Sequence, residues 1–253
     1  TFQAAFSGNF ANKESPANGL LVGAGAAPVA GTNGGATTAK AIAPTSPLSL
    51  GPVTMAWTMV AVLRLIEGSQ NQPNAITLDT PIDALADQLI TKENGTTLKD
   101  IFAHTAADPA QSVAYLANVT IRDCLEMTSG LQDYDEAAWR ERTYKEPDVT
   151  WTPYDVLWSF NKTFLFPPHS PNRKAYSAVG YEILGLILAQ AAGVSTWQAY
   201  SQYKGALPDP IQPYLNETHF PTSGTCSEIP NMLPQYALNT TLSTECQNHV
   251  VTG

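Results

Sequence analysis

Two short segments of the sequence could carry nucleophilic chemistry. Ser159-Phe160-Asn161-Lys162 and Ser201-Gln202-Tyr203-Lys204 each place a lysine three residues after a serine. On a helix this spacing puts both side chains on one face, where the amine could take the proton of a serine nucleophile. Whether either segment is catalytic therefore depends on the element that carries it.

Metal and nucleotide chemistry find little support in the residue spacing. The histidines show no ligand spacing with one another or with the cysteines, which argues against a metal site. They are His104, His169, His219 and His249. The glycines between residues 23 and 35 lack the Gly-Lys-Ser/Thr of a phosphate-binding loop. We therefore predict a chain without a cofactor.

The most apolar stretch predicts a helix over residues 52–68, around which the chain is organised. Pro52 suits the first helical turn, where its missing N–H has no partner to lose, and Gly68 suits a helix end. Apolar residues leave almost no polar face, so we expect this helix to be buried on most sides. Burial should include Trp57, Val60 and Leu63. The apolar run is shorter than the ~20 residues of a membrane span.

Helical patterns dominate the chain that follows. Thr120 and Thr152 are candidate N-caps, and Thr152 precedes a proline at the first helical position. The apolar spacing after Ala178 predicts a second buried helix, which Gly193 would end. We expect helices over residues 97–104, 121–127, 152–162 and 178–192, an extended segment over 76–82, and short strand-like runs at 19–23 and 27–30.

The composition is that of a globular chain with a sizeable core. The 253 residues are 43% hydrophobic, which suffices for one large domain or two. A formal net charge of -9, with 13 Lys and Arg residues and no basic cluster, argues against a nucleic-acid partner or an anionic membrane surface.

Sequons and cysteines indicate the secretory pathway. Sequons ending in threonine are more frequent than chance would give, and they predict glycosylation at Asn94, Asn118, Asn161, Asn216 and Asn239. Cys226 and Cys246 flank a loop poor in apolar residues, where a disulfide would replace missing core. Cys124 follows a helical apolar pattern and should be a buried free thiol. The chain begins at Thr1 without a signal sequence, as a processed secreted protein would.

Four blocks of sequence, in order along the chain, carry motifs that together are far more specific than any one of them. They are Gly51–Met55 with Leu63–Gly68 and Leu78–Pro81; Val119–Leu131; Phe166–Pro168 with Ala175–Gly185; and, more loosely, Pro213–Phe220. The blocks resemble the nucleophile helix with its Leu-Asp-x-Pro segment, the Leu-Leu-x-His-Thr-Ser-Gly-Leu segment, and the Pro-Gly…Tyr-Ser-Asn-x-Gly-Tyr segment of one superfamily. That superfamily comprises the serine β-lactamases and penicillin-binding proteins, and the likeness is to its class C β-lactamase, esterase and D-aminopeptidase-like branch.

The resemblance implies an α/β (α+β) β-lactamase-like fold, in which helices pack on an antiparallel sheet beside a mainly helical lobe. Residues 1–85, including helix 52–68, would form the N-terminal part of the α/β lobe, and residues 86–253 the helical lobe. The C-terminal part of the sheet would then be missing from this chain. A protein partner or a separate segment of the polymer would have to cover the exposed sheet edge.

The same resemblance places inert residues at the catalytic positions. Pro52 stands where the family has its nucleophilic serine, and Met55 where it has the lysine one turn later. Tyr176 keeps the place of the catalytic tyrosine, a proton shuttle, but Ala178 replaces the asparagine that binds substrate. The family's third motif, Lys-Thr-Gly or His-x-Gly, is absent. Both Ser-x-x-Lys segments lie outside the matching helix, so we attribute them to chance.

We therefore predict a secreted glycoprotein with a β-lactamase-like fold whose catalytic residues have been lost, retained as a binding or structural module. Loss of a catalytic serine costs on the order of a millionfold in turnover. The alternative is a working serine hydrolase of the esterase, β-lactamase or D-aminopeptidase type that uses a serine in another register. A third reading, an unrelated helical secreted protein, would be favoured if no sheet packs against the Pro52 helix.

Overall fold

The described structure consists of helices and connecting loops together with one separate β-hairpin. The computed structural model describes residues 51–104, 106–146, 149–215 and 218–222, and the backbone of two strands at 235–238 and 248–251. Residues 51–223 form one compact unit, which holds all the described helices. The hairpin belongs to the other unit and is considered by itself.

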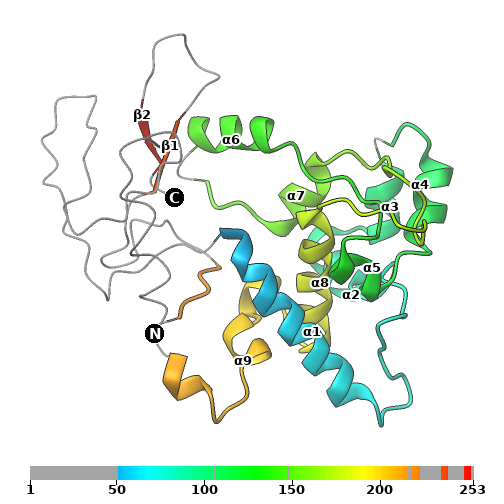
Figure 1. Ribbon diagram of the computed structural model, residues 1–253, viewed down its shortest axis with the longest axis vertical. Helices are drawn as coiled ribbons and strands as arrows, with labels where there is room; N and C mark the ends of the chain where they lie inside the picture. The colour runs from blue at the N-terminus through cyan, green and yellow to red at the C-terminus, as the bar shows by residue number, and fades with distance from the viewer. Residues whose placement is uncertain are drawn as a thin grey trace, which may run out of the picture. The chain divides into compact units, whose positions relative to one another are not determined.

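The helical unit contains three 3-10 turns and nine α-helices among the described residues (Figure 1). The first part comprises η3 (Gly51–Thr54), α1 (Met55–Ser69), α2 (Asp87–Asn94), α3 (Leu98–Ala103), α4 (Pro109–Leu116) and α5 (Ile121–Glu126). The second part comprises α6 (Glu136–Lys145), α7 (Pro153–Ser159), α8 (Ala178–Ala191), η4 (Trp197–Ala199), α9 (Gln202–Ala206) and η5 (Gln212–Leu215). The helices predicted over residues 97–104, 121–127 and 178–192 are thereby confirmed to within one residue at each end.

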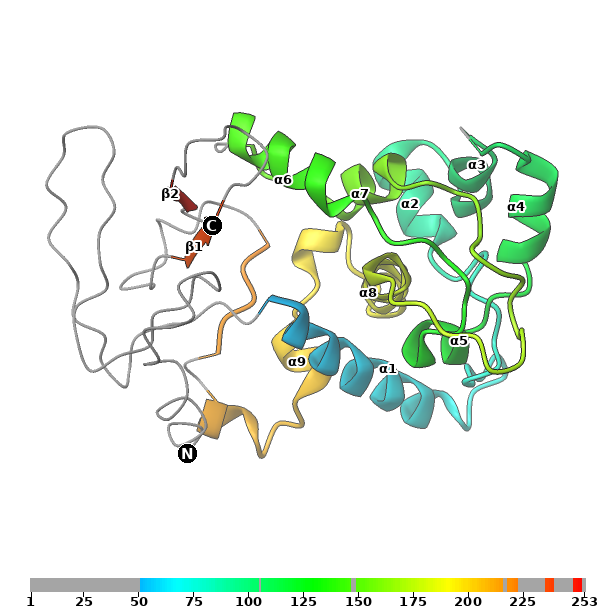
Figure 2. The ribbon, with the colours of Figure 1, turned by 45° about the horizontal axis from the view of Figure 1, so that its top comes forward.

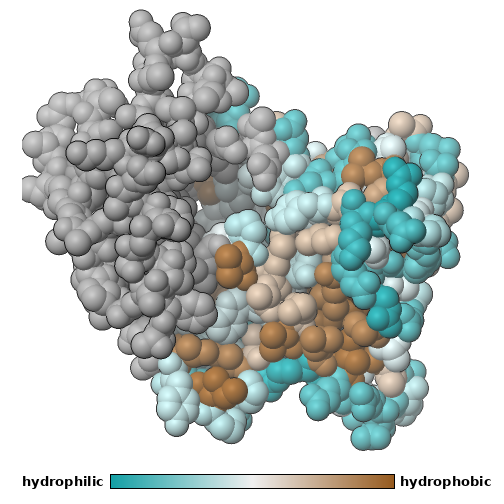
Figure 3. Space-filling model, viewed as in Figure 1, coloured by the Kyte–Doolittle hydropathy of each residue, from teal (hydrophilic) through white to brown (hydrophobic). Residues whose placement is uncertain are grey.

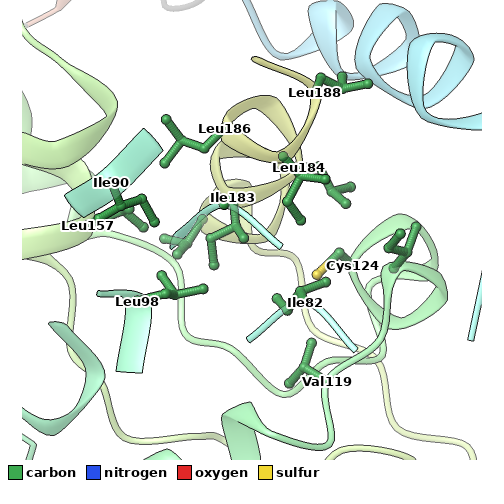
Figure 4. Packing of buried hydrophobic residues seen from close by; sticks show 14 of the residues in the cluster. Ile82, Ile90, Leu98, Val119, Cys124, Leu157, Ile183, Leu184, Leu186 and Leu188 are labelled. Atoms are coloured by element: carbon green, nitrogen blue, oxygen red, sulfur yellow. The ribbon is translucent and has the colours of Figure 1, made fainter. Parts of the chain in front are cut away.

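Helix α8 is the centre of the core. It packs against α1, α2, α5 and α7, and most of its residues are buried, as the sequence predicted (Figure 4). The carboxylate of Asp133 accepts a hydrogen bond of 2.9 Å from the backbone N–H of Ala178, so a neighbouring loop caps the first turn. At the other end Gly193 takes a positive φ of 67°, the conformation predicted for it. Most of the apolar surface of α8 therefore packs against other helices.

Short polar motifs fix where the smaller helices begin. Thr120 and Asp123 form a capping box on α5, in which each side chain accepts a hydrogen bond from the other's backbone N–H. Thr152 and Asp155 do the same on α7, and Pro153 occupies its first turn as predicted. These motifs satisfy N–H groups that would otherwise be left unpaired at a helix start.

The predicted burial of the Pro52 helix is wrong. Residues 51–54 form a 3-10 turn, the α-helix begins at Met55, and it continues past Gly68 to Ser69. Val60 and Leu63 are 40% and 44% exposed, and Ala61 and Val62 are the buried residues of α1. The helix packs on α8 and α9 along one side only (Figure 2). Within the described residues no element covers the other side, which explains the exposure.

Two boundaries also differ from the sequence predictions. The segment 76–82 is extended only in part, because a turn joins Thr77 to Thr80 before Pro81 bridges Thr120. Helix α7 ends at Ser159 instead of Lys162, because the Lys162 amine folds back onto the end of the helix and binds its carbonyl groups.

The described strands pair as a single antiparallel hairpin, β1 (Gln235–Leu238) with β2 (Asn248–Val251), in the register Gln235↔Val251. An antiparallel sheet packed by helices is therefore not confirmed, and the domain boundaries at residue 85 stay a prediction. In the described part of the chain no helix is both long and apolar enough to cross a bilayer. Several predictions lie outside the described residues. They are the strand-like runs at 19–23 and 27–30, the Cys226–Cys246 disulfide, and glycosylation at Asn216 and Asn239.

Candidate functional site

Two residues that the sequence assigned to the site meet where α1 begins. Met55 is the first residue of α1, and the Tyr176 hydroxyl lies 3.9 Å from its Sδ, within reach of a weak O–H···S hydrogen bond. Pro52 lies exposed in the 3-10 turn immediately before. Residues 121 positions apart in the sequence are thus brought to one place, and Tyr176 remains 50% exposed there.

A network of backbone contacts positions the tyrosine. The N–H of Ala175 donates to the carbonyl of Met127 at 3.0 Å, and the N–H of Ser177 approaches the Met127 sulfur at 3.5 Å. The buried Ser177 hydroxyl donates to the carbonyl of Gln132. Met127 and Gln132 follow α5, and Ala175 and Ser177 precede α8. The packing of α5 on α8 therefore fixes the Tyr176 phenol beside α1.

The chemistry available at this point is limited. Pro52 has no group that can act as a nucleophile, and the Met55 thioether cannot take a proton at neutral pH. Ala178 begins α8 with a methyl group in place of an amide. The phenol of Tyr176 can donate or accept a hydrogen bond, but it has no serine or lysine beside it in η3 or α1 to act on.

Both Ser-x-x-Lys segments serve local structure. The Ser159 hydroxyl donates to the carbonyl of Val156, one turn back in α7. The buried Lys162 amine donates to the carbonyls of Trp158 and Phe160 at 2.8 and 2.9 Å, and burial lowers its pKa to about 8. Ser201 caps α9 by accepting from the backbone N–H of Lys204. Neither pair joins its hydroxyl to its amine, which agrees with the interpretation of chance matches.

Cysteine and histidine residues considered in the sequence lie in surroundings that give them no catalytic partner among the described residues. Cys124 is a buried free thiol as predicted, and burial raises its pKa. The His169 Nδ1 lies 3.5 Å from a carboxylate oxygen of Asp123, which already caps α5. Among the described residues no group of three His, Cys, Asp or Glu side chains could hold a metal ion.

The three sequon asparagines in described segments are exposed. Asn94 ends α2, Asn118 follows α4 and Asn161 follows α7. The Asn161 carbonyl oxygen accepts a hydrogen bond of 2.9 Å from the backbone N–H of Thr163, the third residue of its sequon. Each asparagine is therefore accessible, while glycosylation itself stays a prediction.

The sequence analysis missed two features. Glu182 sits on α8 without a hydrogen-bond or ion-pair partner among the described residues, and burial raises its pKa to about 6. The sequence does mark this position, because Glu182 is the single charged residue of a mainly apolar helix. The second is an aromatic cluster on α6, where the Arg142 guanidinium lies 4.3 Å from the centre of the Trp151 ring and 5.7 Å from that of Trp139.

A helical unit built on the central buried helix α8, with Tyr176 held at the start of α1, agrees with the arrangement that the sequence resemblance implies. The Beta-lactamase family model matches residues 19–217, and the chain belongs to that family. This confirms the resemblance seen in the sequence motifs.

A solved structure adds support for the fold. The D-stereospecific amidohydrolase from Streptomyces sp. superimposes with a TM-score of 0.51 at 20% sequence identity, over 79% of this chain and 51% of that chain. The chain thus spans about half the length of that protein. At this identity the likeness shows the fold alone. No curated protein matches the sequence.

Proposed function

We propose that the protein is a catalytically inactive member of the Beta-lactamase family that acts as a binding module. The observation that carries the proposal is the contact between Tyr176 and Met55. The tyrosine still faces the position where the family has its lysine, but a thioether now occupies that position. The geometry of a site has been kept while the groups that perform acyl transfer have been replaced.

Acyl transfer by this family's route needs a nucleophile and a base that takes its proton, and a serine without its base is weakly reactive at neutral pH. Removing a catalytic serine alone typically costs on the order of a millionfold in turnover. Because Pro52 and Met55 remove both groups, no retained hydrogen-bond donor can compensate.

The alternative is a working hydrolase, in which a serine from elsewhere in the chain reaches Tyr176. A turnover assay with a chromogenic ester, a chromogenic cephalosporin and an anilide of a D-amino acid distinguishes the inactive protein from the working hydrolase. We expect no turnover above buffer, and the same baseline for Tyr176→Phe. Turnover that Tyr176→Phe abolishes would establish the hydrolase instead.

We further propose that the protein is a secreted glycoprotein with a Cys226–Cys246 disulfide. The exposure of Asn94, Asn118 and Asn161 supports this. Protein expressed through a eukaryotic secretory pathway should lose mass on treatment with an N-glycosidase, and peptide mapping without reductant should recover the two cysteines in one linked fragment. Unmodified asparagines and two free thiols in secreted material would contradict the proposal.

The open side of α1 supports a further proposal, that a protein partner or another segment of the polymer completes the sheet and covers this helix. The exposed large apolar residues of α1 are Met59, Val60 and Leu63, and Val53 is exposed in the preceding turn η3. Figure 3 shows hydrophobic residues gathered on the face along which α1 runs. Hydrogen exchange of residues 55–69 before and after adding a candidate partner tests it, because a covering layer would slow exchange there. Unchanged exchange with a bound partner would contradict it.

A further inference from the structure

The loop between Phe166 and Ser177 carries Arg173 and Lys174, which are the only two adjacent basic residues of the sequence. Residues 171–174 are all exposed, whereas Phe166 and Ser177 at the two ends are buried. Within the described residues neither cation forms an ion pair, and the Arg173 guanidinium lies 4.8 Å from the centre of the Phe166 ring. The loop therefore presents two neighbouring positive charges to solvent between two fixed ends.

The other lysines and arginines of the described residues stand in different surroundings. Lys162 is buried, and all the rest lie in helices α1, α2, α3, α5, α6 and α9. An endoprotease binds its substrate as an extended segment, which a helix can become only by unfolding, so exposed loops are the preferred places of cleavage. In the described part of the chain, Arg173 and Lys174 are therefore the basic residues that a protease can reach without opening a helix.

The backbone of this loop is held by few contacts. His169 and Asn172 take positive φ angles of 61° and 57°, a conformation that is unfavourable for a residue with a side chain. Inside the loop the Ser170 hydroxyl donates to the Pro167 carbonyl at 2.6 Å, but the two backbone N–H bonds are long, at 3.3 and 3.4 Å. His169 also lies 3.5 Å from the Asp123 carboxylate of α5. Opening this loop should therefore cost far less free energy than opening a helix.

We propose that this loop is a site of limited proteolysis by a trypsin-like endoprotease, whose specificity pocket holds a carboxylate that pairs with a lysine or arginine of the substrate. The bond cleaved joins Lys174 to Ala175, because the Arg173 side chain is held on the Phe166 ring. Water adds its hydroxyl to the Lys174 carbonyl carbon and a hydrogen to the Ala175 nitrogen. The products are a carboxylate and an ammonium group, so the step needs no oxidant or reductant.

Cleavage should leave two chains, residues 1–174 and 175–253, that stay together. Helix α8 belongs to the second chain and packs against α1, α2, α5 and α7 of the first. The predicted disulfide would lie wholly within the second chain, so the packing of helices has to hold the two. The change falls on the site, because Tyr176 becomes the second residue of a new chain while the Ser177 hydroxyl still donates to the carbonyl of Gln132. Cleavage therefore frees the phenol from Met55 and leaves the core intact.

The test is digestion of the full chain with a trace of trypsin, followed by intact mass measurement and N-terminal sequencing. Within residues 51–222 the first new N-terminus should be Ala175. The two chains should co-elute in size-exclusion chromatography and separate only under denaturing conditions. Cuts at Lys13 or Lys40 would shorten the first chain alone and leave this result unaffected. In the cut protein, hydrogen exchange should become faster at Tyr176 and stay slow at residues 183–189.

Two double variants provide the matched comparison. Arg173→Gln with Lys174→Gln should slow the cut by about tenfold or more, because it leaves the protease pocket without a cation to pair with. Lys99→Gln with Lys145→Gln removes the same two charges from exposed positions on helices and should leave the rate unchanged. Lys174→Gln alone should move the new N-terminus to residue 174, because Arg173 then directs the cleavage.

Three results would overturn the inference. A first cut elsewhere within residues 51–222, or an unchanged rate in the variant that lacks Arg173 and Lys174, would remove the proposed site. Chains that separate as soon as they are cut would rule out the two-chain product. Unchanged hydrogen exchange at Tyr176 would rule out the loss of its contact with Met55.

Discussion

Helices α8 and α1 are both strongly apolar, yet they occupy different environments. Helix α8 is enclosed by four other helices, and residues such as Ile183 and Leu184 are completely buried. Among the described helices α1 packs on α8 and α9, and Val60 and Leu63 keep 40% and 44% of their surface exposed. An apolar sequence therefore gives a helix the capacity to be buried, whereas burial itself needs a neighbouring layer.

The largest expected effect is on the free energy of unfolding, which a substitution in α8 should lower more than a substitution in α1. Leu184→Ala should lower the free energy of unfolding by about 2 to 5 kcal/mol, because it opens a cavity in a closely packed core. Leu63→Ala should cost less than about 1 kcal/mol, since its side chain is already half in water. Urea unfolding followed by circular dichroism measures both. Equal losses would mean that α1 is covered in solution.

The glutamates of the two helices, Glu182 on α8 and Glu67 on α1, give a second contrast. The pKa of Glu182 is raised from 4.5 to about 6, so the folded protein holds a proton more tightly than the unfolded chain. Stability should therefore fall as pH rises from about 4.5 to about 6, by about 2 kcal/mol for this shift. Glu182→Gln should remove that loss, making the variant more stable than wild type at pH 8 and not at pH 4.

Glu67→Gln on the exposed part of α1 is the control for this measurement, because it removes the same charge from water-exposed surface. Thermal unfolding across the pH range should show no pH-dependent difference between this variant and wild type. A Glu182→Gln variant that behaves in the same way would show that the carboxyl is better solvated than the structure indicates.

The smallest expected effect concerns how helices begin. Thr120→Ala should destabilise the protein by about 1 to 2 kcal/mol, because its hydroxyl caps α5 and binds the buried Asp123. Thr54 stands at the same position before α1, but its side chain makes no cap bond to the helix. Thr54→Ala should therefore cost less than about 0.5 kcal/mol in the same denaturation assay. A reversed order would contradict the assigned capping boxes.

Local patterns in the sequence were enough to predict most of the helices around the core. Thr120, Thr152 and Pro153 mark helix starts through bonds that span three or four residues, and such bonds are visible in a single sequence. The burial of Cys124 followed from its apolar neighbours in the same way.

What the sequence could not supply depends on distant parts of the chain. The exposure of Leu63 is set by the absence of a covering layer among the described residues, which no pattern within residues 52–68 records. The end of α7 is set by the amine of Lys162, which turns back onto the helix from beyond its end. Within the site, the pairing of Tyr176 with Met55 across the fold could be expected only through the family resemblance.

The measurement that tests the central claim most directly is the mass of the intact protein after incubation with a fluorophosphonate probe. This reagent forms a covalent adduct with an activated serine, so the assay does not require the natural substrate to be known. Because the proposal places Pro52 and Met55 at the positions of the nucleophile and its base, it predicts an unchanged mass over hours at pH 7.5, the same as for Tyr176→Phe. A stoichiometric adduct on one serine, lost when that serine is changed to alanine, would contradict it.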